Sequence, residues 1–77
     1  MNNFHGLEPR FLTVKEAATY LSISIWSLYR MVEDRRIPFI PLNPSAPLRE
    51  KAKKWMIRFD RNALDRWMEK KTIPHLD

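Results

Sequence analysis

The chain has 77 residues, enough for one small domain, and it contains a single glycine and no cysteine. These counts exclude disulfide bridges, thiolate metal sites and glycine-rich phosphate loops. The core must therefore come from the hydrophobic 44% of the chain, which includes three Trp, two Tyr and four Phe residues. All apolar runs are short, so we expect no signal peptide, no membrane span and a cytoplasmic, nucleoid-associated protein.

The formal net charge of +5 is confined to one part of the chain. Residues 49–71 contain nine Lys or Arg and four Asp or Glu, whereas basic and acidic residues are equal in number outside this segment. A basic surface on a small domain indicates a polyanionic partner, above all nucleic acid. The other interpretation is a basic surface that only keeps the protein soluble.

The first regular element is predicted to be a helix that begins at Thr13, after a flexible tail at residues 1–10. Thr13 and Glu16 have the spacing of a capping box, in which each side chain binds the backbone amide of the other. Apolar residues follow at positions 14, 17, 18 and 21, the spacing of one helix face. Ser22 and Ile23 are predicted to form a turn, so a second helix follows at once.

The second helix is predicted over residues 24–36, with Ser24 as its N-terminal cap. The apolar stripe that we expect to face the core consists of Ile25, Leu28, Met31 and Val32. Tyr29 falls at the edge of this stripe, whereas Trp26, Arg30 and Glu33 fall on the opposite side. The outward face of this helix therefore combines an aromatic ring with an arginine.

Two extended segments are predicted next. Residues 37–42 contain two prolines, which suit an edge strand. Residues 55–59 alternate, with Trp55, Ile57 and Phe59 on one face. We expect the two segments to pair as a hairpin with a long tip at residues 43–54.

The last predicted element is a helix that Asp60 caps and that ends at Lys70 and Lys71. Its apolar positions are 64, 67 and 68, and residues 72–77 are expected to form a tail. The largest side chains assigned to the core are Trp55, Phe59, Leu64 and Trp67. The whole is an α+β, mostly α, domain over residues 11–71.

The order of elements is that of a winged helix-turn-helix, in which a hairpin wing precedes the last helix. Within it stand LTVKEAATYLSIS at 12–24, LYRMV at 28–32, IP at 37–38, RF at 58–59 and ALDRWM at 63–68. These stretches resemble the excisionase-type helix-turn-helix family. That family is related to the MerR DNA-binding domain and is similar to AlpA-like phage regulators.

The resemblance implies sequence-specific binding of duplex DNA, with helix 24–36 in the major groove and the basic wing 43–54 on the backbone. Family members include recombination directionality factors, which bind and bend DNA and help integrase to excise an element. We therefore expect an excisionase of a phage or integrated element, with integrase as its protein partner. A small transcription regulator that contacts RNA polymerase is the alternative, and an adaptor that no longer reads DNA is the second alternative.

The sequence departs from the family pattern at three places. Trp26 stands where members usually have a polar or basic residue, Arg35 stands near a usual glycine, and the wing is longer than usual. Three interpretations are open for Trp26. It contacts a thymine methyl or sugar, it contacts a partner protein, or it forms a cation–π pair with Arg30.

Other residues of the second helix are also candidate DNA contacts. Arg30 is expected to bind a guanine edge or a phosphate, and an ion pair with Glu33 or Asp34 is the alternative. Ser27 is expected to bind phosphate with the free amides of the first turn. Tyr29 is either a phosphate donor through its hydroxyl group or a half-buried packing residue.

The remaining candidate contacts are basic, and a solvated surface is the alternative for them. They are Arg35 and Arg36 at the helix end, and Arg49, Lys51, Lys53, Lys54 and Arg58 in the wing. The two histidines lie in the tails, so we expect no metal and no cofactor, and no Ser, His and acid arrangement predicts an enzyme. Cooperative self-association is open, because so small a chain covers little DNA.

Overall fold

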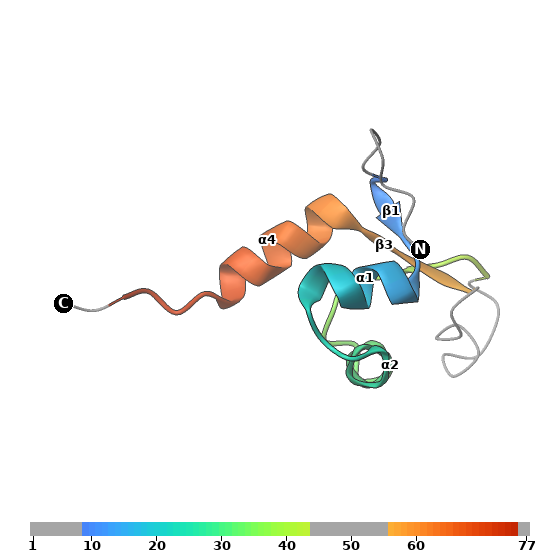
Figure 1. The fold of residues 1–77 in the computed structure, drawn as a ribbon, viewed down its shortest axis with the longest axis horizontal. Helices are drawn as coiled ribbons and strands as arrows, with labels where there is room; N and C mark the ends of the chain where they lie inside the picture. Colours follow the sequence, from blue (N-terminus) through green and yellow to red (C-terminus); the bar gives the residue numbers. More distant parts are fainter. Residues whose placement is uncertain (1–8, 44–55, 76–77) are drawn as a thin grey trace.

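A computed structural model describes residues 9–43 and 56–75 of the chain (Figure 1). Within these residues the protein is a small α+β domain with three helices and a three-stranded antiparallel sheet. In chain order the elements are β1 (Phe11–Leu12), α1 (Val14–Leu21), α2 (Ile25–Glu33), β2 (Ile40–Pro41), β3 (Ile57–Asp60) and α4 (Arg61–Lys71). The predicted order of two helices, a hairpin and a last helix is confirmed.

The predicted capping box starts α1. The hydroxyl oxygen of Thr13 accepts a hydrogen bond from the Glu16 amide at 3.2 Å, and the Glu16 carboxylate accepts one from the Thr13 amide at 2.9 Å. Two orphan amides of the first turn are thereby satisfied. The small side chains of Ala17 and Ala18 are buried, which lets α2 pack closely against α1. Ser22 then turns the chain with a positive φ of 59°.

The second helix begins as predicted but ends three residues early. Ser24 caps α2, and the helix stops at Glu33 rather than at residue 36. Arg35 has a left-handed φ of 55°, its amide donates to the Val32 carbonyl, and the Arg36 amide donates to the Met31 carbonyl. This pair of bonds is a Schellman motif, which terminates a helix and usually has glycine at the left-handed position.

The position of Ile25 was predicted wrongly. It was assigned to the core, but its side chain is 42% exposed, whereas Leu28 and Val32 of the same stripe are fully buried. The reason is that Ile25 is the first residue of α2. Side chains in a helix tilt toward its N-terminus, so the first one projects beyond the helix and past the core.

The sheet places β3 in the centre, with β1 on one side and β2 on the other. The predicted hairpin is confirmed, since β2 pairs antiparallel with β3 and sets Ile40 opposite Arg58. The third strand, β1, was not predicted, and it sets Phe11 opposite Asp60. Trp55 and the tip of the hairpin lie outside the described residues.

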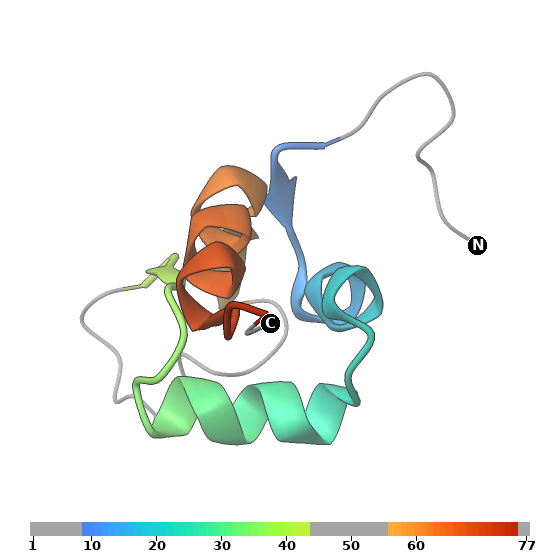
Figure 2. The same cartoon turned by 90° about the vertical axis from the view of Figure 1, so that its left-hand side faces the viewer.

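The core lies between the helices and the inner face of β3 (Figures 1 and 2). Ile57 and Phe59 alternate with Arg58 and are both fully buried, as predicted. From α4, Leu64 is fully buried, and Trp67 is half-buried against the same cluster. The indole nitrogen of Trp67 donates a hydrogen bond to the Arg36 carbonyl at 3.0 Å, which ties α4 to the chain just after α2.

Candidate nucleic-acid interface

The outward face of α2 carries most of the residues predicted to contact DNA in that helix. Leu28 and Val32 anchor the helix on its inner side, so Trp26 and Arg30 face solvent. Trp26 is 68% exposed, which is unusual for so large an apolar side chain. Tyr29 is half-buried and packs against the core cluster, which is the packing alternative considered for it.

Trp26 and Arg30 form a pair one helical turn apart. The guanidinium carbon of Arg30 lies over the Trp26 ring, 5.0 Å from its centroid, within the range of a cation–π contact. Asp34, which was an alternative partner for Arg30, instead lies 3.7 Å from the guanidinium of Arg36. The contact with Arg30 leaves most of Trp26 exposed, so contact with DNA or with a protein stays a prediction.

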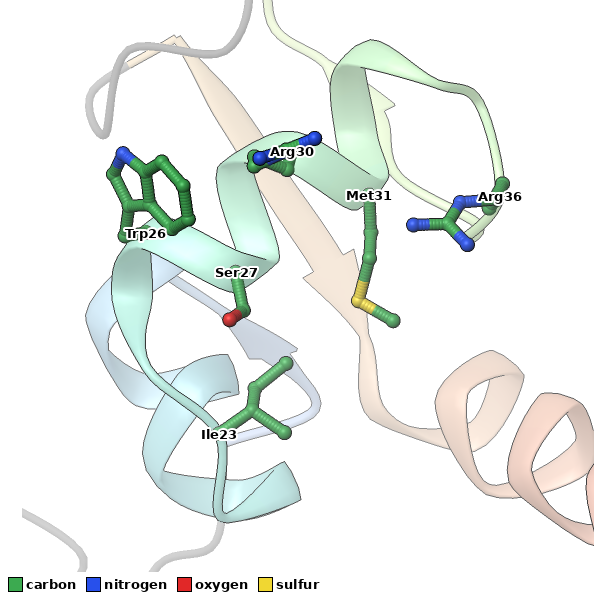
Figure 3. A pocket seen from close by; sticks show the side chains of 6 residues that line it. All are labelled: Ile23, Trp26, Ser27, Arg30, Met31 and Arg36. Atoms are coloured by element: carbon green, nitrogen blue, oxygen red, sulfur yellow. The ribbon is translucent and has the colours of Figure 1, made fainter.

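An open hollow of about 380 Å³ runs along this face of α2 (Figure 3). Four of its lining residues, Trp26, Ser27, Arg30 and Arg36, were predicted as DNA contacts. The other two, Ile23 and Met31, were not, because the sequence pattern assigned them to the turn and to the apolar stripe. The hollow therefore joins apolar walls to two arginines and a hydroxyl group.

The first turn of α2 is already partly occupied by its own cap. The Ser24 hydroxyl oxygen accepts a hydrogen bond from the Ser27 amide at 3.0 Å, and the Ser24 hydroxyl donates to the Ser27 hydroxyl oxygen at 2.9 Å. The cap therefore uses the Ser27 amide, and binding of a phosphate by Ser27 and the other amides of the first turn stays a prediction.

The structure describes three of the remaining basic candidates, two just beyond α2 and one on β3. Arg35 and Arg36 are exposed just beyond α2, and Arg36 reaches the hollow. Arg58 is half-buried on β3, where its guanidinium donates to the Ile57 carbonyl at 2.8 Å. The four basic residues of the wing tip, Arg49, Lys51, Lys53 and Lys54, lie outside the described residues.

A second charged contact joins Arg10, directly before β1, to Asp60 at the start of α4. The guanidinium of Arg10 donates to both carboxylate oxygens of Asp60, at 3.2 Å each, and the same carboxylate caps α4 by accepting from the Asn62 amide at 3.1 Å. The hydrogen bond from Arg10 is the main reason that the pKa of Asp60 lies below its ordinary value, and the same bond raises the pKa of Arg10. The pair connects the residue before β1 to the start of α4, and neither residue lines the hollow.

The described residues, 9–43 and 56–75, hold no cluster of three His, Asp or Glu side chains that could bind a metal ion. None of the helices formed by these residues combines the length and the apolar character needed to cross a membrane.

Comparison with known proteins gives one match. The sequence profile of the family described as "Helix-turn-helix domain" matches residues 11–72, from β1 to just past α4. Neither the curated proteins nor the solved structures gave a match. Since the matched stretch covers most of the chain and contains both α2 and the hairpin, the chain belongs to the helix-turn-helix domain family.

Proposed function

We propose that this protein binds duplex DNA with sequence preference and acts as an excisionase, that is, a recombination directionality factor. Membership of the helix-turn-helix domain family suggests DNA as the partner, and domains of this kind are typically not enzymes. The observation that carries the proposal is the outward face of α2, where Trp26 and Arg30 are exposed and Ser27 is half-buried, while Leu28 and Val32 are buried on the inner side. In a helix-turn-helix domain the second helix enters the major groove.

The binding mode has two parts. In the first, α2 lies in the major groove, and Arg30 reaches base edges while Arg35 and Arg36 approach phosphates. In the second, the β2–β3 hairpin acts as a wing that directs Arg49, Lys51, Lys53, Lys54 and Arg58 toward the backbone. Residues 49–54 contain four Lys or Arg and one Glu, and this local excess of positive charge supports the second part.

Fluorescence anisotropy with a labelled random duplex of roughly 30 base pairs tests the proposal. We expect binding that weakens between about 50 and 200 mM salt, with a log–log slope near −4 for four or five phosphate contacts. A single-stranded oligonucleotide of the same length is the control. Failure to bind any duplex at low salt would overturn the proposal in favour of an adaptor.

The excisionase role needs a separate experiment, because a small transcription regulator of the same family would bind DNA in the same way. The resemblance of residues 12–24 and 63–68 to excisionase-type proteins supports the role in recombination. The decisive assay adds the protein to the integrase and attachment sites of the element that carries its gene. Stimulated excision is expected, and altered transcription without any effect on excision would favour the regulator.

A further inference from the structure

The Trp26–Arg30 pair is the feature of α2 that general binding of phosphates does not explain. A phosphate contact needs only a positive charge, and Arg30 would supply it without an aromatic neighbour. Trp26 is nevertheless kept 68% exposed on the solvent side of the helix, against 42% for its neighbour Ile25. An apolar ring of this size held beside a cation on a recognition surface indicates an apolar group in the ligand.

The cation–π contact with Trp26 leaves Arg30 able to bind a base edge. All N–H donors of a guanidinium lie in its plane, so a ring over one face does not block them. In the major groove a guanine presents two acceptors, O6 and N7, which match two of these donors. Holding the guanidinium over the ring also reduces the rotamer freedom that Arg30 loses on binding.

The ring then lies beside the neighbouring base pair. Successive base pairs are about 3.4 Å apart along the duplex, and the Arg30 guanidinium carbon lies 5.0 Å from the Trp26 ring centroid. If Arg30 pairs with a guanine, Trp26 therefore faces the edge of the next base pair. The one apolar group that a natural base pair presents there is the C5-methyl of thymine.

The hollow extends the apolar surface on the same side of the helix. Ile23 and Met31 line it together with Trp26, while Ser27, Arg30 and Arg36 supply its polar groups (Figure 3). Two arginines on this face oppose the docking of a basic protein surface and favour a ligand that combines negative charge with small apolar groups. Duplex DNA with thymine methyl groups in its major groove has this combination.

We propose that Trp26 and Arg30 read a two-base-pair step, a guanine bound by Arg30 with a thymine in the adjacent base pair whose methyl group contacts Trp26. This inference rests on the proposed function, because it requires α2 to lie in the major groove. It goes further by naming the base-pair step that α2 prefers. It also gives Trp26, which departs from the family pattern, a direct role in sequence specificity.

The test starts with selection of binding sites from a random duplex pool by the complete protein. The selected sites are expected to share a guanine next to a thymine. In the best duplex, deoxyuridine then replaces that thymine, which removes only the methyl group, and 7-deazaguanine replaces the guanine, which removes only the N7 acceptor. We expect uracil to weaken binding about fourfold, the effect of burying one methyl group.

Two variants connect these effects to the side chains. Trp26→Ala should bind the thymine and uracil duplexes equally, and Arg30→Ala should bind the guanine and 7-deazaguanine duplexes equally. Ile25→Ala is the matched control, because Ile25 is the adjacent exposed apolar residue and Arg30 lies over Trp26 instead, so this variant should keep both preferences. Circular dichroism checks that each variant is folded. We expect all three to fold, because the three replaced side chains are exposed.

The possible results separate the inference from the proposed function. The inference is overturned, and DNA binding stays intact, if the protein binds duplex DNA tightly but with the same affinity for thymine and uracil. The same holds if uracil weakens binding of Trp26→Ala as much as it weakens binding of the unchanged protein. Unchanged affinity of Trp26→Ala for its best duplex also overturns it, and points to a protein contact for the ring. Absence of any duplex binding overturns both.

Discussion

Arg10 lies directly before β1 and Asp60 ends β3, and the guanidinium of Arg10 donates to both oxygens of the Asp60 carboxylate, at 3.2 Å each. The same carboxylate caps α4, and the Arg10 carbonyl accepts a hydrogen bond from the Arg61 amide at 2.7 Å. One acidic side chain thus joins the unpredicted strand β1, the central strand β3 and the last helix. The first prediction concerns this contact.

Acid should weaken this contact in a defined pH range. The pKa of Asp60 in the folded protein lies below its ordinary value of 3.8, so its stabilising effect is complete above that value. The effect is lost as the pH falls from 3.8 toward the lower pKa of the folded state. Asp60→Asn should lower the thermal unfolding midpoint near neutral pH and reduce its dependence on pH in this acid range.

Asp34→Asn is the control for this experiment. Asp34 lies 3.7 Å from Arg36, but both side chains are more than half exposed, so solvent screens the pair. Its removal should leave the unfolding midpoint nearly unchanged. An equal decrease for both variants would show that general charge, rather than the bonds to Asp60, accounts for the effect.

The second prediction concerns the left-handed residue after α2. Arg35 has a φ of 55°, a conformation that strains residues with a Cβ atom and that glycine adopts freely. Arg35→Gly should raise the free energy of unfolding by about 0.5–1 kcal/mol, as measured by urea denaturation. Asp34→Gly should have the opposite sign, because Asp34 has an ordinary φ of −85°. If Arg35→Gly and Asp34→Gly both lower the free energy of unfolding, strain at the left-handed Arg35 is contradicted.

The third prediction compares two residues of one apolar stripe. Leu28→Ala should lower the free energy of unfolding by about 2–5 kcal/mol, because Leu28 is fully buried and its truncation leaves a cavity. Ile25→Ala should lower it by less than about 1 kcal/mol, because Ile25 is 42% exposed. Chemical denaturation of both variants measures the difference. Equal losses would place Ile25 in the core after all.

The fourth prediction concerns the attachment of α4. Trp67→Phe keeps an aromatic ring but loses the hydrogen bond from the indole nitrogen to the Arg36 carbonyl, so it should destabilise the fold by about 1 kcal/mol. Lys71→Ala is the control, since it removes only the cation that lies 4.9 Å from the Trp67 ring centroid. Thermal unfolding should distinguish them, and a larger loss for Lys71→Ala would refute the role of the hydrogen bond.

The fifth prediction separates base contacts from phosphate contacts. Replacing Lys53 and Lys54 by Ala should weaken binding to all duplexes and reduce the salt slope by nearly two, roughly 0.9 for each lost phosphate contact. Arg30→Ala should instead reduce discrimination between selected and random duplexes. Anisotropy titrations at several salt concentrations measure both quantities. Equal losses for Arg30→Ala on selected and random DNA would refute a base contact.

The sequence by itself determined the local elements of this protein. The capping box at Thr13 and Glu16, the caps at Ser24 and Asp60 and the alternation through Phe59 were all predicted correctly. Each of these depends on residues within one turn or one strand, so short-range spacing suffices. The outward direction of Trp26 followed in the same way from helical periodicity.

Tertiary structure decided the features that depend on distant contacts. Two residues are too few to show the alternation of a strand, so β1 became visible only through its pairing with β3, which lies almost fifty residues later. Periodicity likewise assigned Ile25 to the core, because it gives the direction of a side chain but not the place where the core ends. The hollow beside Arg30 joins the turn, α2 and Arg36, and only the packed fold brings these together.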